Sequence, residues 1–390
     1  MNSAIGKRLV LVLLLLAALV SLASGIKNAY HYSQDFQWDA AEALRLGYDP
    51  YDLSLGVNNV ENIPELDDFY NYFESIEAKQ KMEANQFPSL LILLFIYTLM
   101  PYRTAVLIWL ISNLIFTAVI IYLLRKGYMK NMDRGCFAAL SLLMIAGTPW
   151  RNQIGVGQHT LFAFMFFLLA VFLSDNDNDM AAGLALAVSY FKYTLTAPLA
   201  LIFIYRRKWK SFFISLGVHI LLTVLSALWL RESFIDMLIK PLRVSSALAG
   251  EGSIDLSAIL GGSKIAMIIA LLVMCALFIF SLKMRRENEE LLFSLYLLVS
   301  LIITYHRSYD FFVLTAVYSG VNTLACRLEG RGGKILRISY FLFLLYLFFG
   351  LRIFSESEAS LALAALLYYT FLIVYTLLVL RPDEGFIQKG

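Results

Sequence analysis

Acidic residues beside aromatic ones open the one long polar stretch of this chain, residues 27–87. Asp35 stands next to Phe36 and close to Trp38, and Asp39 follows one helical turn later. A carboxylate held at the membrane surface beside aromatic rings is partly desolvated, which strengthens it as a general base. Asp35 is therefore the candidate catalytic base, although a solvated loop acid is the other interpretation of any one of these residues.

Basic residues that lie apart from the basic clusters are candidates for holding an anionic leaving group. Lys192, Arg151 and Arg307 are of this kind, and a phosphate group that leaves needs such cationic neighbours. Lys192 lies between two apolar segments, where an ionisable side chain is a functional hypothesis. The alternative for Lys192 is snorkelling of its ammonium group to the interface.

A third set of polar side chains could position the hydroxyl groups of a substrate. Gln158 and His159 follow a glycine, and His306 and Asp310 are one helical turn apart. The further candidates for substrate binding are Asp39 and Tyr51. A structural role is the competing interpretation of each histidine, and a place in the interfacial aromatic belt is that of Tyr51.

Composition limits what kind of protein can carry these residues. The chain of 390 residues is 59% hydrophobic and 16% charged, which excludes a soluble globular fold. Its net charge of +3 gives no reason to expect a nucleic-acid partner. The three cysteines show no metal-ligand spacing, so we expect no metal site, no cofactor and no disulfide framework, while dependence on a divalent metal stays open.

The sequence predicts an all-α polytopic membrane protein of one domain, residues 1–390, with about twelve transmembrane helices. The hydrophobic segments are 9–26, 88–100, 104–124, 135–148, 160–174, 180–191, 194–205, 211–230, 263–282, 291–304, 311–325, 338–351 and 360–380. Clusters of basic residues near 7, 125, 206, 283, 331 and 381 are placed inside by the positive-inside rule. With both termini cytoplasmic, segment 88–100 has to be a short re-entrant segment between two prolines.

The first outer loop, residues 27–87, carries a net charge of −8, which suits a neutral polyol such as a sugar. Two helices are expected in it. Residues 34–46 would place Asp35, Asp39 and Glu42 on one face, with Gly47 as the helix stop. Residues 65–82 would form an amphipathic helix that lies in the membrane interface.

Several motifs, taken in order, resemble glycosyltransferase family 87 of the polytopic GT-C superfamily. They are Gln34-Asp35-Phe36, Gly47-Tyr48-Asp49-Pro50-Tyr51, Phe87-Pro88-Ser89-Leu90, Gly157-Gln158-His159-Thr160, Lys192 followed by Pro198, and His306-Arg307-Ser308-Tyr309-Asp310. The similarity spans roughly residues 9–320. Ser89 stands where the family has a second proline, and the spacing from Lys192 to Pro198 is longer than in the family.

The resemblance implies a GT-C-like mannosyltransferase that takes its sugar from a polyprenyl phosphate at the outer leaflet. Asp35 would then be the base that activates an acceptor hydroxyl, and the sugar would transfer with inversion. The implied partners are membrane lipid, the polyprenyl-phosphate sugar and a glycan or glycolipid acceptor. The implied location is the bacterial inner membrane, with an extracytoplasmic active site.

Other functions remain possible from the sequence. A transporter or flippase for a lipid-linked glycan would favour broken helices at the midplane and internal repeats, and no convincing repeat is present. A polymerase or ligase of surface polysaccharide and a non-catalytic scaffold are the two further alternatives.

Overall fold

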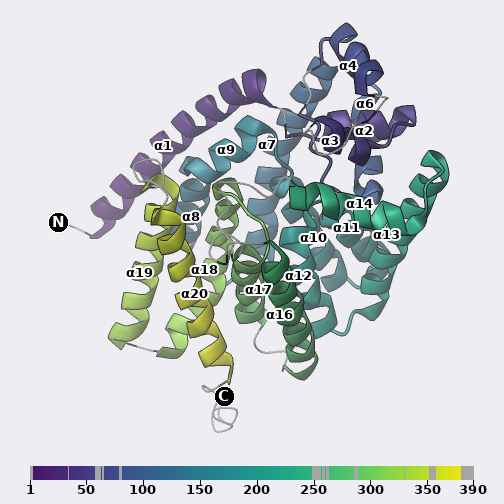
Figure 1. Ribbon diagram of the computed structural model, residues 1–390. Helices are drawn as coiled ribbons and strands as arrows, with labels where there is room; N and C mark the ends of the chain where they lie inside the picture. The colour runs from purple at the N-terminus through teal and green to yellow at the C-terminus, as the bar shows by residue number, and fades with distance from the viewer. Residues whose placement is uncertain are drawn as a thin grey trace.

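The computed structural model is helical throughout the part of the chain that it describes (Figure 1). It describes residues 3–33, 35–57, 63, 66–78, 81–247, 256, 260, 263–284, 289–328, 330–350 and 357–378. The predicted outer hairpin around 352–360, the second half of the loop 231–262 and the basic residues near 381 lie wholly or partly outside these ranges. No strand occurs among the described residues, which confirms the all-α prediction.

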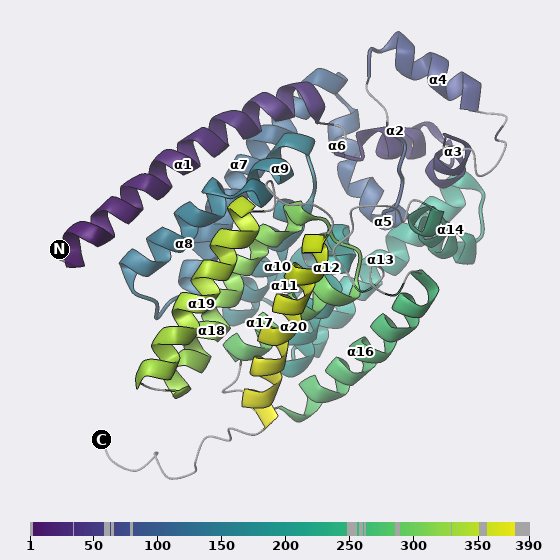
Figure 2. The ribbon, with the colours of Figure 1, turned by 60° about the vertical axis from the view of Figure 1, so that its left-hand side comes forward.

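Long helices form a bundle, and shorter ones gather at one of its ends (Figures 1 and 2). The bundle contains α1 (Ser3–Tyr32), α7 (Tyr102–Lys126), α8 (Arg134–Ala146), α10 (Thr160–Asp175), α11 (Asp179–Ser189), α12 (Tyr193–Tyr205), α13 (Trp209–Leu230), α16 (Ser263–Lys283), α17 (Glu289–Ile303), α18 (Leu314–Leu328), α19 (Gly330–Phe349) and α20 (Ser357–Leu378). The shorter helices are α2 (Trp38–Leu46), α3 (Pro50–Val57), α4 (Leu66–Ser75), α5 (Pro88–Leu91), α6 (Phe95–Thr98), α9 (Thr148–Val156) and α14 (Phe234–Ala247).

Seven helical stretches among the described residues are long and apolar enough to cross a membrane. They are Gly6–Tyr32, Tyr102–Lys126, Asp179–Tyr205, Trp209–Leu230, Ile265–Lys283, Ser308–Leu328 and Gly330–Phe349. The pair α9 and α10 would add an eighth, although it bends by 106°. Twelve crossings stay a prediction, because segments such as 135–148 form helices shorter than a bilayer core requires.

One of these stretches, Asp179–Tyr205, folds back on itself at a 3-10 turn, η2 (Tyr190–Lys192). A straight helix of this length would separate its ends by roughly 40 Å. Instead Arg206 pairs with Asp175 at 2.7 Å and Lys208 pairs with Asp177 at 3.0 Å. The beginning of α11 and the end of α12 therefore lie at the same end of the bundle, as the sequence predicts for segments 180–191 and 194–205.

Predicted inner segments meet at the end of the bundle opposite the short helices. The Tyr128 ring stacks on Phe293 at 3.8 Å, and Arg206 also pairs with Glu289. The exposed acids Asp175 and Asp177 thus pair with the basic residues Arg206 and Lys208. This grouping agrees with the charge-based topology, while the side of the membrane stays a prediction.

The first outer loop differs from expectation in its second helix. Among the described residues of the predicted helix 65–82, only Leu66–Ser75 is helical, as α4. Its apolar residues Phe69 and Phe73 are buried inside the loop, where Phe69 meets Tyr48 at 5.7 Å and Phe73 meets Trp38 at 5.8 Å. This stripe is used to build the core of the loop, so it is not free to lie on a bilayer.

The first outer loop also packs on α13 and α14 through a small hydrophobic core that shares no buried residue with the core of the bundle. Its buried members are Ala40, Leu44, Tyr51, Leu55, Ala84, Leu91, Ala227, Met237 and Val244. Segment 88–100 lies next to it as α5, a 3-10 turn and α6, and Ser89 contacts His219 of α13 at 2.7 Å. These pieces together are too short for a full crossing.

Candidate active site

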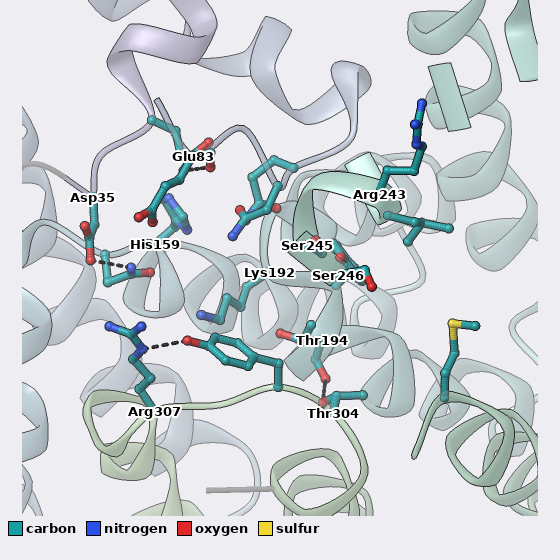
Figure 3. A pocket seen from close by; sticks show the side chains of 18 of the residues that line it. Asp35, Glu83, His159, Lys192, Thr194, Arg243, Ser245, Ser246, Thr304 and Arg307 are labelled. Atoms are coloured by element: carbon teal, nitrogen blue, oxygen red, sulfur yellow. Dashed lines mark hydrogen bonds between the residues drawn. The ribbon is translucent and has the colours of Figure 1, made fainter. Parts of the chain in front are cut away.

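A cavity of about 520 Å³ lies where the first outer loop meets the bundle (Figure 3). The loop, the bend between α9 and α10, the turn at Lys192, and helices α14, α16 and α17 with the residues after α17 contribute to its wall. The polar lining residues used below are Asp35, Lys81, Glu83, Gln158, His159, Lys192, Arg243, Tyr305 and Arg307. The apolar ones are Ile239, Leu242, Ala266, Met267, Ala270 and Ile303.

Asp35 is held between the first outer loop and the bend after α9. Its backbone N–H donates to the carbonyl of Val156 at 3.0 Å. Its two carboxylate oxygens take one donor each: Lys81 Nζ at 2.8 Å from Oδ1 and Gln158 Nε2 at 2.7 Å from Oδ2. The side chain is 13% exposed, so this carboxylate is largely withdrawn from solvent yet opens into the cavity.

Gly157 makes the bend that brings Gln158 to Asp35. Its φ is +76°, in the left-handed region that glycine adopts without strain. A Cβ atom at this position would lie 2.3 Å from the Ser33 hydroxyl oxygen. The Gly157 carbonyl accepts a hydrogen bond from Trp109 Nε1 at 2.8 Å, and Trp109 stacks on Phe36 at 4.7 Å. Phe36, the residue after Asp35, is therefore linked through Trp109 to the bend at Gly157.

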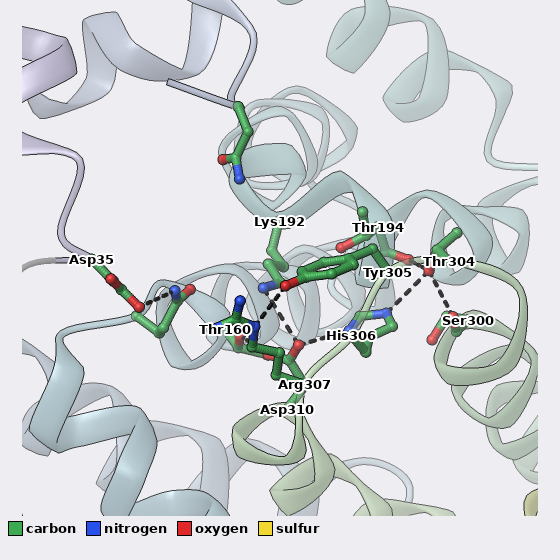
Figure 4. Close-up of polar contacts among 12 residues, drawn as sticks. Asp35, Thr160, Lys192, Thr194, Ser300, Thr304, Tyr305, His306, Arg307 and Asp310 are labelled. Atoms are coloured by element: carbon green, nitrogen blue, oxygen red, sulfur yellow. Dashed lines mark hydrogen bonds and ion pairs between the residues drawn. The ribbon is translucent and has the colours of Figure 1, made fainter. Parts of the chain in front are cut away.

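Lys192 ends the 3-10 turn between α11 and α12 and lines the cavity, where it lies beside Tyr305 (Figure 4). Its ammonium nitrogen is 3.4 Å from Asp310 Oδ2 and 5.4 Å from the centre of the Tyr309 ring. Only 9% of the Lys192 side chain is exposed, and none of the Asp310 side chain is. A buried ammonium needs such a partner, and Asp310 supplies it.

Asp310 is the centre of a buried polar network. Thr160 donates to Oδ1, and the ring nitrogen Nδ1 of His306 lies 2.8 Å from Oδ2. The other ring nitrogen of His306 is 3.1 Å from the Thr304 hydroxyl. Neither Asp310 nor His306 lines the cavity, so both act on its contents through Lys192.

The cavity carries more positive than negative side chains. Lys81, Lys192, Arg243 and Arg307 face two carboxylates, Asp35 and Glu83. Lys81 bridges these two carboxylates, and Arg307 Nε donates to the Tyr305 hydroxyl at 2.6 Å. The excess of positive charge suits an anionic ligand group.

The sequence-based candidates divide into two groups. Asp35, Gln158, His159, Lys192 and Arg307 come together at the cavity, although they are far apart in the chain. His159 is 2% exposed, its ring packs on Phe191 at 4.7 Å, and its ring nitrogens have no hydrogen-bond partner among the described residues.

The other candidates do not line the cavity. Asp39 accepts the backbone N–H groups of Lys81 and Met82 at 2.8 and 2.7 Å, so it holds the segment that carries Lys81. Burial raises the pKa of Asp39, against the opposing effect of these hydrogen bonds. The buried Tyr51 hydroxyl donates to the Gln86 carbonyl at 2.7 Å, and Arg151 lies on α9 beside Thr148.

Sequence reasoning missed Lys81, Glu83 and Arg243. Lys81 stands 46 residues after Asp35, and its approach depends on the backbone contacts to Asp39. No short-range spacing in the sequence predicts a contact between residues this far apart. The acidic, uneven composition of the loop was the available signal, because a lone basic residue in an acidic loop is expected to find a carboxylate partner.

A second cluster of acidic residues lies at the far side of α14. Asp49, Asp52 and Glu232 have carboxylate oxygens within 4.8 Å of one another. Lys240 sits among them, with its ammonium nitrogen 2.6, 2.9 and 3.3 Å from Asp49, Asp52 and Glu232. Burial opposes the charge on Lys240, but the neighbouring carboxylates outweigh it and raise the pKa of Lys240. Lys240 therefore clamps the first outer loop to α14.

Comparison with known families gives one match. The model of the family described as Glycosyltransferase family 87 matches residues 88–306, more than half of the chain. The matched region contains Gln158, Lys192 and His306, and Asp35 lies before it. No curated protein and no solved structure matches the chain.

Proposed function

Because the chain belongs to glycosyltransferase family 87, we propose that it transfers a sugar, mannose, from a polyprenyl phosphate to an acceptor hydroxyl. The reaction takes place on the extracytoplasmic side of the bacterial inner membrane, and both termini are cytoplasmic. The acceptor is a glycan or a glycolipid. Asp35 is the general base, and the configuration at the anomeric carbon is inverted.

The observation that carries this proposal is the division of one cavity into a charged and an apolar part. Asp35 and the cations Lys192 and Arg307 lie in the charged part, and the apolar part consists of Ile239 and Leu242 of α14 with Ala266, Met267 and Ala270 of α16. Arg243 of α14 adds a further cation to the lining. A polyprenyl phosphate has the same division, with an anionic group at the end of an apolar chain. α16 stands at the edge of the bundle (Figure 2), where a lipid can approach from the side.

The residues present account for each part of the transfer. Asp35 takes the proton of the acceptor hydroxyl, and the hydroxyl oxygen attacks the anomeric carbon. The bond from that carbon to the phosphate oxygen breaks, and its electron pair stays on the phosphate. Lys192 and Arg307 stabilise the negative charge that develops on the leaving polyprenyl phosphate. A single displacement of this kind inverts the anomeric centre.

Gln158 adds to the positioning of the base. It donates to Oδ2 of Asp35 and leaves the remaining lone pairs of the carboxylate for the acceptor. Lys81 occupies a second side of the carboxylate, with its ammonium nitrogen 2.8 Å from Oδ1. The burial of Lys81 opposes its own charge, but Asp35 and Glu83 outweigh burial and raise the pKa of Lys81.

The test is transfer of labelled mannose from polyprenyl-phosphate mannose by the purified protein in lipid nanodiscs. Native protein should transfer the label, and Asp35→Asn should lower the rate by roughly 10²–10⁴-fold, the usual contribution of a general base. Asp68→Asn is the matched control, because Asp68 is an exposed acid of the same loop. Full transfer by Asp35→Asn would reject the assignment of the base.

The transporter alternative predicts a different result. Native protein would then move lipid-linked glycan across a liposome membrane and transfer no sugar from any polyprenyl phosphate. No observation in the structure favours that alternative over the transferase, and the family match supports the transferase.

A further inference from the structure

The hydrogen bonds around His306 determine how many protons its ring carries. Nδ1 lies 2.8 Å from Oδ2 of Asp310, and a carboxylate can only accept, so Nδ1 must carry a proton. Nε2 lies 3.1 Å from the Thr304 hydroxyl oxygen, which can either donate or accept. The protonation of the ring therefore depends on where the single hydroxyl proton of Thr304 goes.

That hydroxyl proton is needed elsewhere. The carbonyl of Thr194 in α12 would ordinarily accept from the backbone N–H four residues later, but this residue is Pro198, which has no N–H. The Thr304 hydroxyl takes that place, 2.9 Å from the Thr194 carbonyl oxygen, and it also lies 2.7 Å from the Ser300 carbonyl oxygen. Thr194 is half-buried at the cavity wall, and a carbonyl withdrawn from solvent without a donor is costly, so the proton of Thr304 points to these carbonyls.

The Thr304 oxygen can then only accept from His306, which requires a proton on Nε2 as well. We propose that His306 is an imidazolium that shares the one carboxylate of Asp310 with Lys192 and so leaves a net positive charge beneath the cavity. Lys192 and His306 are both cationic in this arrangement, and among the described residues Asp310 is the carboxylate in contact with both.

Burial makes this uncompensated charge important. The side chains of His306 and Asp310 are fully buried, and of the three groups only Lys192 lines the cavity. Nearby Arg307 adds positive charge, and Asp35 is already paired with Lys81. Unpaired charge in a desolvated site is costly, so a ligand anion that reaches Lys192 relieves this cost. His306 is thus a positioning residue for the phosphate of the donor, which it does not touch.

The identification of the anion as a lipid phosphate rests on the proposed function, but the protonation of His306 can be measured without it. The chain has four histidines, which makes ring-nitrogen NMR of histidine-labelled protein in nanodiscs practical. At neutral pH, the His306 ring should show protons on both nitrogens. Signals of the other rings can be identified with His31→Gln, His159→Gln and His219→Gln, so no folded variant of His306 is required. A His306 ring with one unprotonated nitrogen would overturn the proposal.

A comparison of farnesyl phosphate with farnesol, which lacks the phosphate, distinguishes an effect of the His306 charge from an effect of His306 on packing. His306→Gln should weaken the binding of farnesyl phosphate by about tenfold, the order expected when one positive charge is removed near a partly desolvated anion, and leave the binding of farnesol unchanged. His219→Gln is the matched control, because His219 also makes two hydrogen bonds, to Ser89 and the Ala187 carbonyl, away from the cavity. Equal weakening of both ligands, or no weakening of farnesyl phosphate, would contradict the proposal.

Failure of the transferase proposal would look different. In that case the protein would transfer no sugar and would still have a doubly protonated His306, with His306→Gln weakening farnesyl phosphate and not farnesol. That result would reject the transferase proposal and support the charged site.

Discussion

Replacing Lys240 by methionine should convert the clamp between the first outer loop and α14 into a cation-dependent contact. Met keeps most of the apolar stem and removes the ammonium that now lies within 3.3 Å of three carboxylates. Asp49, Asp52 and Glu232 would then face one another without a counter-charge. Like charges this close repel, and the contact between loop and helix should loosen.

The size of the effect follows from the burial of the cluster. Removing one partner of a fully buried ion pair costs about 3–5 kcal/mol. Asp49 is 13% exposed, but Asp52 and Glu232 are each 33% exposed, and solvent screens their repulsion. We therefore expect a loss of about 2–3 kcal/mol of unfolding free energy, with a matching fall in the thermal midpoint of a few degrees.

Calcium should reverse this loss in the variant. The three carboxylates offer oxygen ligands within 4.8 Å of one another, a set that a hard divalent cation prefers. The assay is the thermal midpoint of nanodisc-embedded protein with a chelator and with millimolar calcium. Lys240→Met should regain stability in calcium, while native protein and the exposed-lysine control Lys130→Met should not respond. An unchanged midpoint in Lys240→Met, or no response to calcium, would refute the reasoning.

Three further changes test other parts of the structure. Gly157→Ala should cost more than about 1 kcal/mol, since alanine at φ +76° is strained and its Cβ would meet Ser33; a native thermal midpoint would contradict this. Burial raises the pKa of Asp39 above the unfolded value of about 3.9, so native stability should fall relative to Asp39→Asn as pH rises from about 4; thermal midpoints across a pH series that stay parallel would disprove it. Ala270→Trp should fill the apolar part of the cavity and raise the KM for polyprenyl-phosphate mannose several-fold; an unchanged KM would remove α16 from the donor site.

The polar residues that the sequence could place correctly are those fixed by topology. Gln158, Lys192 and Arg307 follow from the order of apolar segments and basic clusters, which puts their turns at one end of the bundle. The turn at Lys192 is the best example, because the ion pairs of Arg206 and Lys208 close the hairpin that charge alone predicts.

The parts that the sequence could not supply depend on tertiary contacts. The sequence predicts a helix over residues 34–46, but Gln37 has a φ of +60° and α2 begins at Trp38, so Asp35 lies before the helix and meets Gln158. Residue 34 lies outside the described residues. Asp35 accordingly lies outside α2, whereas Asp39 and Glu42 stay three residues apart on this helix and bind different partners. The apolar stripe of α4 is equally suited to a bilayer or to a small protein core, and only packing against Trp38 and Tyr48 decides between them.

The small separate core between the first outer loop and α13–α14 gives this part of the molecule its own cooperative unit. Proteins open in such units, each with its own free energy. Amide hydrogen exchange should therefore find weaker protection in α14, whose buried residues Met237 and Val244 belong to this small core, than in α17, whose buried residues belong to the core of the bundle. If the part of the cavity wall that α14 contributes opens locally while the bundle core stays folded, the cavity can admit bulky molecules without loss of order in the bundle.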